Sequence, residues 1–229
     1  MGFTKEQKYI HLLALHCADV PSATGLLRGE MGIVLVLAHY AKARNNPYIE
    51  KVADFVLEQV LDNLTKHEDI SLAYGLSGIG WGLEYLIQNG YLKGDSIDIC
   101  EEIDKRIMSV DIRRMCDKSF ETGMRGILMY VLLHLQGGLK NGQFAFDAGY
   151  LNDWTSRLRM LIEEEPREDC WQEGLRIIES MAKIQGYSQQ SLSLRPFIKT
   201  MTRCPPKRLG LQDGLAGYIE LQLTKEESV

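Results

Sequence analysis

The sequence predicts an all-α fold built from repeated pairs of helices, and two observations lead to this prediction. First, a short motif recurs: a glycine, a hydrophobic residue, any residue, and then a glycine or an aliphatic residue. Its copies start at residues 29, 75, 123, 174 and 214. The spacing is about 40 to 50 residues, which is typical of architectures that stack supersecondary units. Second, no alternating run of strand length competes with the helical periodicity.

Each repeat combines two kinds of helix. The first half is almost entirely apolar, as in ILMYVLLHL at residues 127–135, so it should be buried on most sides. The second half is amphipathic, with apolar residues three or four positions apart and charges between them. These apolar residues are Ile49, Val52, Val56 and Val60 in the first repeat, Ile99, Ile103 and Ile107 in the second, and Leu151, Trp154, Leu158 and Leu161 in the third. One buried and one half-exposed helix per hairpin predict an incomplete double ring of inner and outer helices.

The repeats start near residues 22, 71, 119, 169 and 208, after an N-terminal helix at about residues 5–17. The fourth repeat is the weakest, because Ile177 occupies its second glycine position. The last repeat lacks an outer helix. We therefore expect either dimerisation or capping of this repeat by the N-terminal helix through Ile10, Leu13 and Ala14. Nothing marks a linker, so residues 1–229 are expected to form one domain of about five hairpin repeats.

The repeated glycines require an explanation, because each glycine inside a helix costs about 1 kcal/mol relative to alanine. Since they recur at the start of the inner helices, we expect them to permit a tight loop and a close approach of each helix to its neighbours. The glycines assigned this structural role are Gly29, Gly32, Gly75, Gly78, Gly123, Gly126, Gly174, Gly214 and Gly217.

Composition excludes several classes of function. The formal net charge is −5, so there is no basic excess to favour nucleic acid as a partner. No apolar stretch is long enough for a membrane span, and the N-terminus lacks a signal-peptide pattern. Five cysteines, an odd number without a CxxC pair, suit reduced thiols. We therefore expect a cytoplasmic protein.

The segment GLSGIGWGLEYL at residues 75–86, with its echoes in the other repeats, resembles the lanthionine synthetase C-like family. The resemblance implies an α/α toroid with the glycine motifs at the N-termini of the inner helices. It also implies, for the cyclase members, the addition of Cys thiols to dehydrated Ser or Thr residues of a peptide. Those members hold zinc with a Cys from one inner-helix loop and a Cys-His-Gly from another.

This chain departs from that ligand pattern. Ala73 and Tyr74 stand before the matching glycine, and Cys170 has no histidine in a comparable loop. His39 and His134 are expected to be ordinary core or surface residues. We therefore expect no metal and no cofactor. The leading hypothesis is a zinc-less binding or accessory member of the family, related to peptide modification. Its expected partners are a peptide or other small ligand in the central cavity. A second copy of the chain or a partner enzyme is also expected to bind.

The loops before the inner helices should place backbone N–H groups at the cavity mouth. Side chains from several repeats should converge there. The candidates are Arg28, Glu30, Tyr74, Glu121, Arg125, Trp171, Glu173 and Asp213. Among the tryptophans, Trp171 is the candidate to face a ligand, because it is expected in a loop beside Glu173, whereas Trp81 and Trp154 lie at periodic core positions. The acids Glu121, Glu173 and Asp213 suit helix capping. The alternative that we keep open is a carboxylate cluster, either for a divalent cation or for a glycan-active or glycan-binding toroid.

Overall fold

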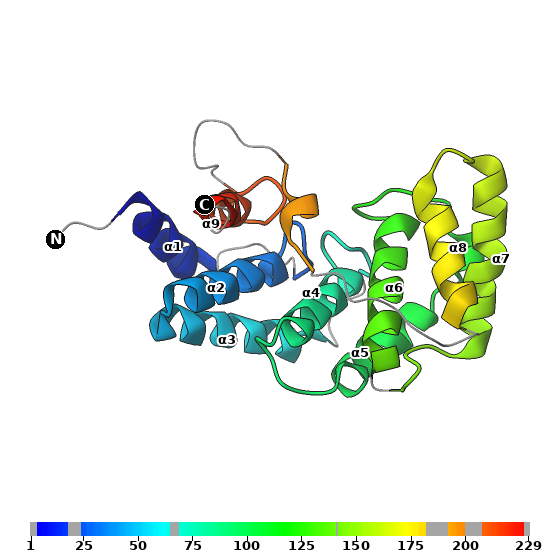
Figure 1. Cartoon of the computed structure of the whole chain (residues 1–229), viewed down its shortest axis with the longest axis horizontal. Coiled ribbons are helices and arrows are strands. Elements are labelled where there is room, and N and C mark those ends of the chain that lie inside the picture. The colour runs from blue at the N-terminus through cyan, green and yellow to red at the C-terminus, as the bar shows by residue number, and fades with distance from the viewer. Residues whose placement is uncertain are drawn as a thin grey trace.

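The computed structural model describes residues 4–17, 24–64, 69–140, 142–181, 192–199 and 208–226, and all regular structure in these ranges is helical. The all-α class is therefore confirmed, and the arrangement is consistent with an incomplete α/α toroid. The first three repeats provide the inner helices α2 (Glu30–Arg44), α4 (Leu76–Gln88) and α6 (Met124–Lys140). The outer helices that follow them in the chain are, in the same order, α3 (Pro47–Asp62), α5 (Ser96–Met108) and α7 (Ala148–Glu164). Figure 1 shows these helices following one another along the long axis of the molecule.

Burial follows the two patterns expected from the sequence. In α4, every residue from 76 to 86 is buried, as the apolar composition predicts. The helices α3, α5 and α7 bury one face only. Trp154, Leu158 and Leu161 of α7 are fully buried, whereas Met160 between them is exposed. The helix α3 packs along α2, and α5 along α4.

The last repeat lies beside the first one. Its helix α9 (Leu215–Glu226) packs against α2, and the N-terminal helix α1 (Lys5–His16) packs against α9. Figure 1 shows α1 and α9 at the same end of the molecule as α2. The rings of Tyr9 and Tyr218 meet edge to face at 5.7 Å, and Ile10 and Leu13 are fully buried. The structure thus confirms capping of the last repeat by the N-terminal helix.

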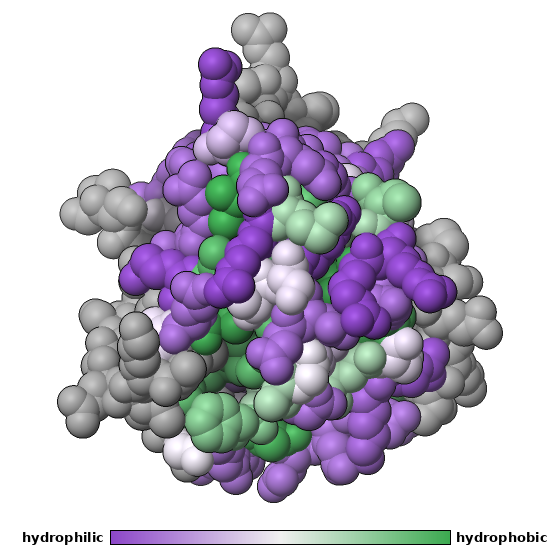
Figure 2. Space-filling view, turned by 90° about the vertical axis from the view of Figure 1, so that its right-hand side faces the viewer, coloured by the Kyte–Doolittle hydropathy of each residue, from purple (hydrophilic) through white to green (hydrophobic). Residues whose placement is uncertain are grey.

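The fourth repeat departs from the expected loop. Its helix α8 (Asp169–Met181) begins five residues before Gly174, so the stretch DCWQEG is helical and does not form the expected loop. It packs against α6 and α7. Glu173, Arg176 and Glu179 are exposed on it. Figure 2 shows that hydrophilic side chains predominate over this end of the molecule.

Two short helical turns complete the described structure. They are η3 (Ile112–Arg114), which packs against α7, and η4 (Arg195–Phe197), which precedes the loop leading into α9. None of the described helices is both long and apolar enough to cross a membrane.

Candidate functional site

Four glycine-containing loops precede inner helices: the first loop (residues 24–29), the second (69–75), the third (117–123) and the last (208–214). Each folds back on the helix that it introduces. In the second loop, the Leu76 N–H donates to the Asp69 carbonyl at 2.9 Å. Equivalent bonds across seven residues join Met31 to Thr24, Met124 to Asp117 and Leu215 to Arg208. These four backbone N–H groups were expected to face a ligand at the cavity mouth. They donate to carbonyl groups of their own loops instead, so the expectation was wrong for these four groups.

The glycines permit this folding back. A Cβ at Gly78 would overlap the carbonyl oxygen of Leu72 in its own loop and the backbone nitrogen of Leu26 in the first loop. The same relation recurs in the other repeats, where a Cβ on Gly32, Gly126 or Gly217 would overlap the carbonyl of Leu26, Phe120 or Leu211. The close approach predicted from the repeat pattern is therefore a contact between backbones, which only glycine accommodates.

Backbone hydrogen bonds also join the loops to one another. The last loop donates to the first from the Gln212 N–H to the Leu27 carbonyl, at 2.9 Å. The first loop donates to the second from Leu26 to Leu72, at 3.0 Å, and the second to the third from Ala73 to Glu121, at 2.9 Å. The four loops thus form a continuous rim that brings side chains distant in the sequence together.

Arg28 lies at the centre of a polar group on this rim, here called the Arg28 cluster. Its Nη2 is 3.2 Å from Glu121 Oε2 and 4.0 Å from Asp213 Oδ2. Gln212 Nε2 donates to Glu121 Oε1 at 2.9 Å. Two further cations complete the cluster. They are Lys199, 3.7 Å from Glu121, and Arg208, 3.1 Å from Asp213.

The Arg28 cluster is partly buried and incompletely hydrogen-bonded. The side chains of Arg28, Glu121 and Asp213 are 27%, 33% and 29% exposed. The pKa of Glu121 lies below its ordinary value because Gln212 donates a hydrogen bond to it and because Arg28 and Lys199 are positively charged. Within the described residues, Arg28 Nε and Gln212 Oε1 are buried without a hydrogen-bond partner. Each such group costs about 1–3 kcal/mol unless a further molecule satisfies it.

A second group of candidates forms a separate cluster between α6 and α8. Arg125 lies 5.3 Å from the ring of Trp171 and 2.9 Å from Glu168. The indole Nε1 of Trp171 donates to Glu165 at 3.0 Å. Trp171 is fully buried in α8, so the expectation that it faces a ligand was wrong. It anchors the fourth repeat instead.

The three predicted acids do not form one cluster. Glu173 lies on α8 and pairs with Arg176 on the same helix, whereas Glu121 and Asp213 both contact Arg28. The alternative of a single cluster of all three carboxylates is therefore wrong, because Glu173 belongs to a helix rather than to a rim loop.

The two remaining candidates lie on the rim but outside the Arg28 cluster as defined above. Glu30 begins α2, and partial burial raises the pKa of its carboxyl group. Tyr74 is half-buried in the second loop, and its carbonyl accepts a hydrogen bond from the Gly25 N–H at 3.1 Å.

The described residues do not fit the zinc site that the resemblance implies for cyclases. Ala73 is fully buried where such a site needs a ligand side chain, and Tyr74 follows it. Cys170 is exposed at the start of α8, where partial burial raises the pKa of its thiol. In the part of the chain that the structure describes, no three His, Cys, Asp or Glu residues are placed to hold a metal ion. Cys204 and His67 lie outside that part.

One buried polar group was not foreseen as a unit. His134 of α6 contacts Glu84 of α4 through Nδ1 at 2.6 Å and Asp104 of α5 through Nε2 at 2.9 Å. Tyr130 donates to the same Asp104 at 2.6 Å. Burial lowers the pKa of His134, but the two carboxylates outweigh it and raise the pKa to about 9. The prediction of His134 as a core residue fits this position. A charged Glu84 inside an otherwise apolar inner helix was the signal for its partner.

Comparison with known proteins gave one match. The family model described as lanthionine synthetase C-like protein matches residues 21–149, which is more than half of the chain and covers the first three loops. No curated protein and no solved structure gave a significant match.

Proposed function

The chain belongs to the lanthionine synthetase C-like family, and on that premise we propose that it acts in peptide modification as a zinc-less binding or accessory protein. We further propose that residues 1–229 form one toroid domain of about five repeats, working in the cytoplasm. The peptide site is the Arg28 cluster on the rim, and Glu30 and Tyr74 flank it.

The observation that carries this proposal is the pair of unpartnered atoms in the Arg28 cluster. Arg28 Nε is a hydrogen-bond donor and Gln212 Oε1 is an acceptor, and both are buried. A peptide group offers the complementary pair, a carbonyl oxygen and an N–H. Mixed charges around them, from Glu121, Asp213 and Arg208, suit a peptide with side chains of either sign better than a simple anion.

Chemistry at the same residues supports binding more than hydrolysis. A general acid at neutral pH needs a carboxyl group with a raised pKa. The pKa of Glu121 is lowered instead, and Glu173 does not join the cluster. Neither Glu121 nor Glu173 therefore supports the glycan-active alternative. A reducing-sugar assay on the wild type and on Asp213→Asn tests it directly, because a signal that depends on Asp213 would establish that alternative.

The binding proposal is tested with an array of synthetic octapeptides that contain Cys and Ser or Thr. We expect the wild type to retain a subset of these peptides and Arg28→Gln to lose about tenfold or more in affinity for them, as for a buried hydrogen-bonded charge. Arg159→Gln is the matched control, since Arg159 also pairs with an acid, Glu179 at 2.8 Å, but lies on α7. Equal binding by both variants would exclude the Arg28 cluster as the peptide site.

The zinc-less part of the proposal needs a separate measurement. Purified protein equilibrated with zinc and then dialysed should retain far less than one zinc ion per chain. Stoichiometric zinc that is lost on Cys170→Ala would contradict the proposal and point to an active cyclase.

A further inference from the structure

The segment 192–199 follows the fourth repeat in the chain and contacts the third and last loops through Lys199. Leu194 and Phe197 are buried, whereas Arg195, Pro196 and Lys199 are exposed. The segment thus meets the repeats through two buried apolar side chains, and the partly buried Leu192 and Ile198 also pack against the core. No part of the repeat pattern predicted it.

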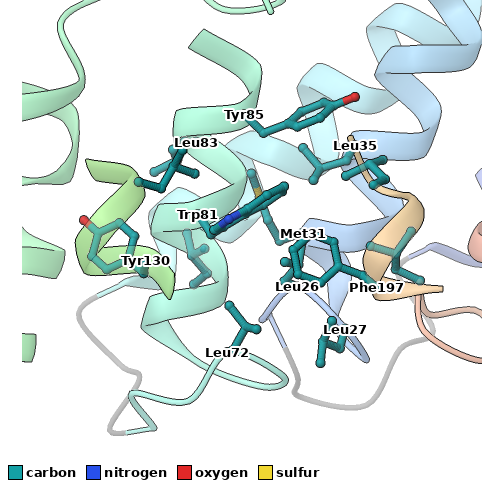
Figure 3. Packing of buried hydrophobic residues seen from close by; sticks show 14 of the residues in the cluster. Leu26, Leu27, Met31, Leu35, Leu72, Trp81, Leu83, Tyr85, Tyr130 and Phe197 are labelled. Carbon is teal, nitrogen blue, oxygen red and sulfur yellow. The ribbon is translucent and has the colours of Figure 1, made fainter. Parts of the chain in front are cut away.

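Phe197 completes a row of aromatic rings that the repeats provide. Its ring meets Trp81 of α4 edge to face at 4.6 Å and stacks on Phe120 of the third loop at 6.1 Å. Trp81 stacks in turn on Tyr85, and Tyr85 on Tyr91, at 5.7 and 6.1 Å. Figure 3 shows Phe197 reaching from its own turn toward Trp81, with Leu26 and Met31 nearby. Aromatic rings of the second and third repeats therefore surround the ring of Phe197.

Lys199 ties the same segment to the Arg28 cluster. Its Nζ lies 3.7 Å from Glu121, the residue that also pairs with Arg28. Its backbone N–H donates to the Gln212 carbonyl at 2.8 Å. An aromatic side chain, a backbone N–H two residues later and a positive charge on that residue are all recognised by groups of the rim. None of these three contacts requires the segment to be covalently attached.

We propose that the face formed by Trp81, Phe120, Glu121 and the Gln212 carbonyl is a peptide-binding groove that the chain's own residues 192–199 occupy. The groove selects peptides in which an aromatic residue is followed two positions later by Lys or Arg. This inference rests on the proposed peptide-binding function and names its ligand class. A free peptide must displace the internal segment, so its apparent affinity is reduced by the fraction of molecules in which the groove is already filled.

The test uses the peptide LSLRPFIK, which copies residues 192–199, against the full-length chain. The variant Phe197→Ala removes the internal anchor and should bind this peptide about tenfold or more tightly than the wild type does. Binding is followed by tryptophan fluorescence, since Trp81 lines the groove while Trp154 and Trp171 are fully buried elsewhere. Control peptides with Phe replaced by Ala, or Lys by Glu, should bind at least about tenfold more weakly.

A folded Phe197→Ala protein that binds LSLRPFIK no better than the wild type overturns the inference. If Phe197→Ala fails to fold, Lys199→Ala replaces it, because it removes only a 58% exposed side chain and its ion pair with Glu121. It should raise the affinity for the peptide about threefold or more, since the internal segment then competes less well. Unchanged affinity in this variant also overturns the inference. Arg28-dependent binding to the octapeptide array would then persist if only the inference fails, and would be absent if the proposed function itself fails.

Discussion

The second and fourth repeats begin with the same Gly-Leu pair but are joined to their neighbours by different means. In the second repeat, Gly75 and Gly78 let the loop backbone lie directly against its own helix and the first loop. In the fourth repeat, the same pair falls inside α8, and the buried ring of Trp171 holds the helix in place. Ile177 explains the difference, because its Cβ stands where a loop carbonyl would have to lie. A joint between backbones requires glycine, whereas a side-chain anchor does not.

The largest expected effect is that of Gly78→Ala. Its methyl group would overlap two backbone positions, Leu72 and Leu26, which are hydrogen-bonded to each other and cannot move apart independently. We expect a loss of at least about 4 kcal/mol in the free energy of unfolding, or no folded protein. Urea denaturation followed by circular dichroism measures it. A loss below about 1 kcal/mol would contradict the idea of a backbone joint.

Trp171→Ala should be the next largest change, at about 3 kcal/mol, because it leaves a large cavity. The effect should be local, since the extensive packing of α8 in the described structure is with α6 and α7. Hydrogen exchange should accelerate in α7 and α8 while α2 and α4 stay protected. Uniform acceleration through all the helices would show that the fourth repeat is joined as tightly as the second. Trp171→Phe keeps a ring beside Arg125 and should cost only about 1 kcal/mol.

A pH titration tests a second contact of the second repeat, a buried ion pair that the fourth repeat does not share. The His134 group ties the second repeat to the third, and the folded pKa of His134 is about 9, above its ordinary value of 6.5. Its stabilisation is therefore fully present below pH 6.5 and is lost as the pH rises through 9. The loss amounts to at most about 3 kcal/mol. Unfolding free energies measured between pH 6 and 10 should fall in the wild type and less in His134→Gln. Parallel curves for the two proteins would be inconsistent with a charged, buried His134.

The smallest effect is expected for Gly174→Ala. A Cβ there would lie 2.9 Å from the flexible end of the Leu128 side chain and would touch no backbone. The helix gains about 1 kcal/mol from the replacement of glycine, which offsets the small shift of Leu128. The free energy of unfolding should therefore change by less than about 1 kcal/mol. Destabilisation comparable to that of Gly78→Ala would remove the contrast between the two repeats.

Several features were predictable because local pattern and burial agree. Helix type and the amphipathic faces of α3, α5 and α7 follow from apolar spacing that the structure reproduces. Capping by α1 was one of two alternatives, and the packing of α1 on α9 supports it. Arg28, Glu121 and Asp213 were identified because each lies one or two residues before a repeated glycine, and the rim brings those positions together. Trp171 and Glu173 were misplaced because the residues before Gly174 were expected to form a loop, although Ile177 replaces the second glycine of the motif there. Lys199 was missed since it lies outside every repeat.

The sequence by itself determined the repeat, because the motif recurs at regular spacing. It also determined the positions where a side chain would obstruct the fold, because glycine occupies them. It also indicated the family, through the glycine motif, whose first three copies start within the matched residues 21–149. Only the tertiary structure decided which loops become neighbours, since the last loop bonds to the first across almost the whole length of the chain. The same packing set Phe197 and Lys199 against the rim. Such contacts join segments that are far apart in the sequence, and no local sequence pattern predicts which distant segments will meet.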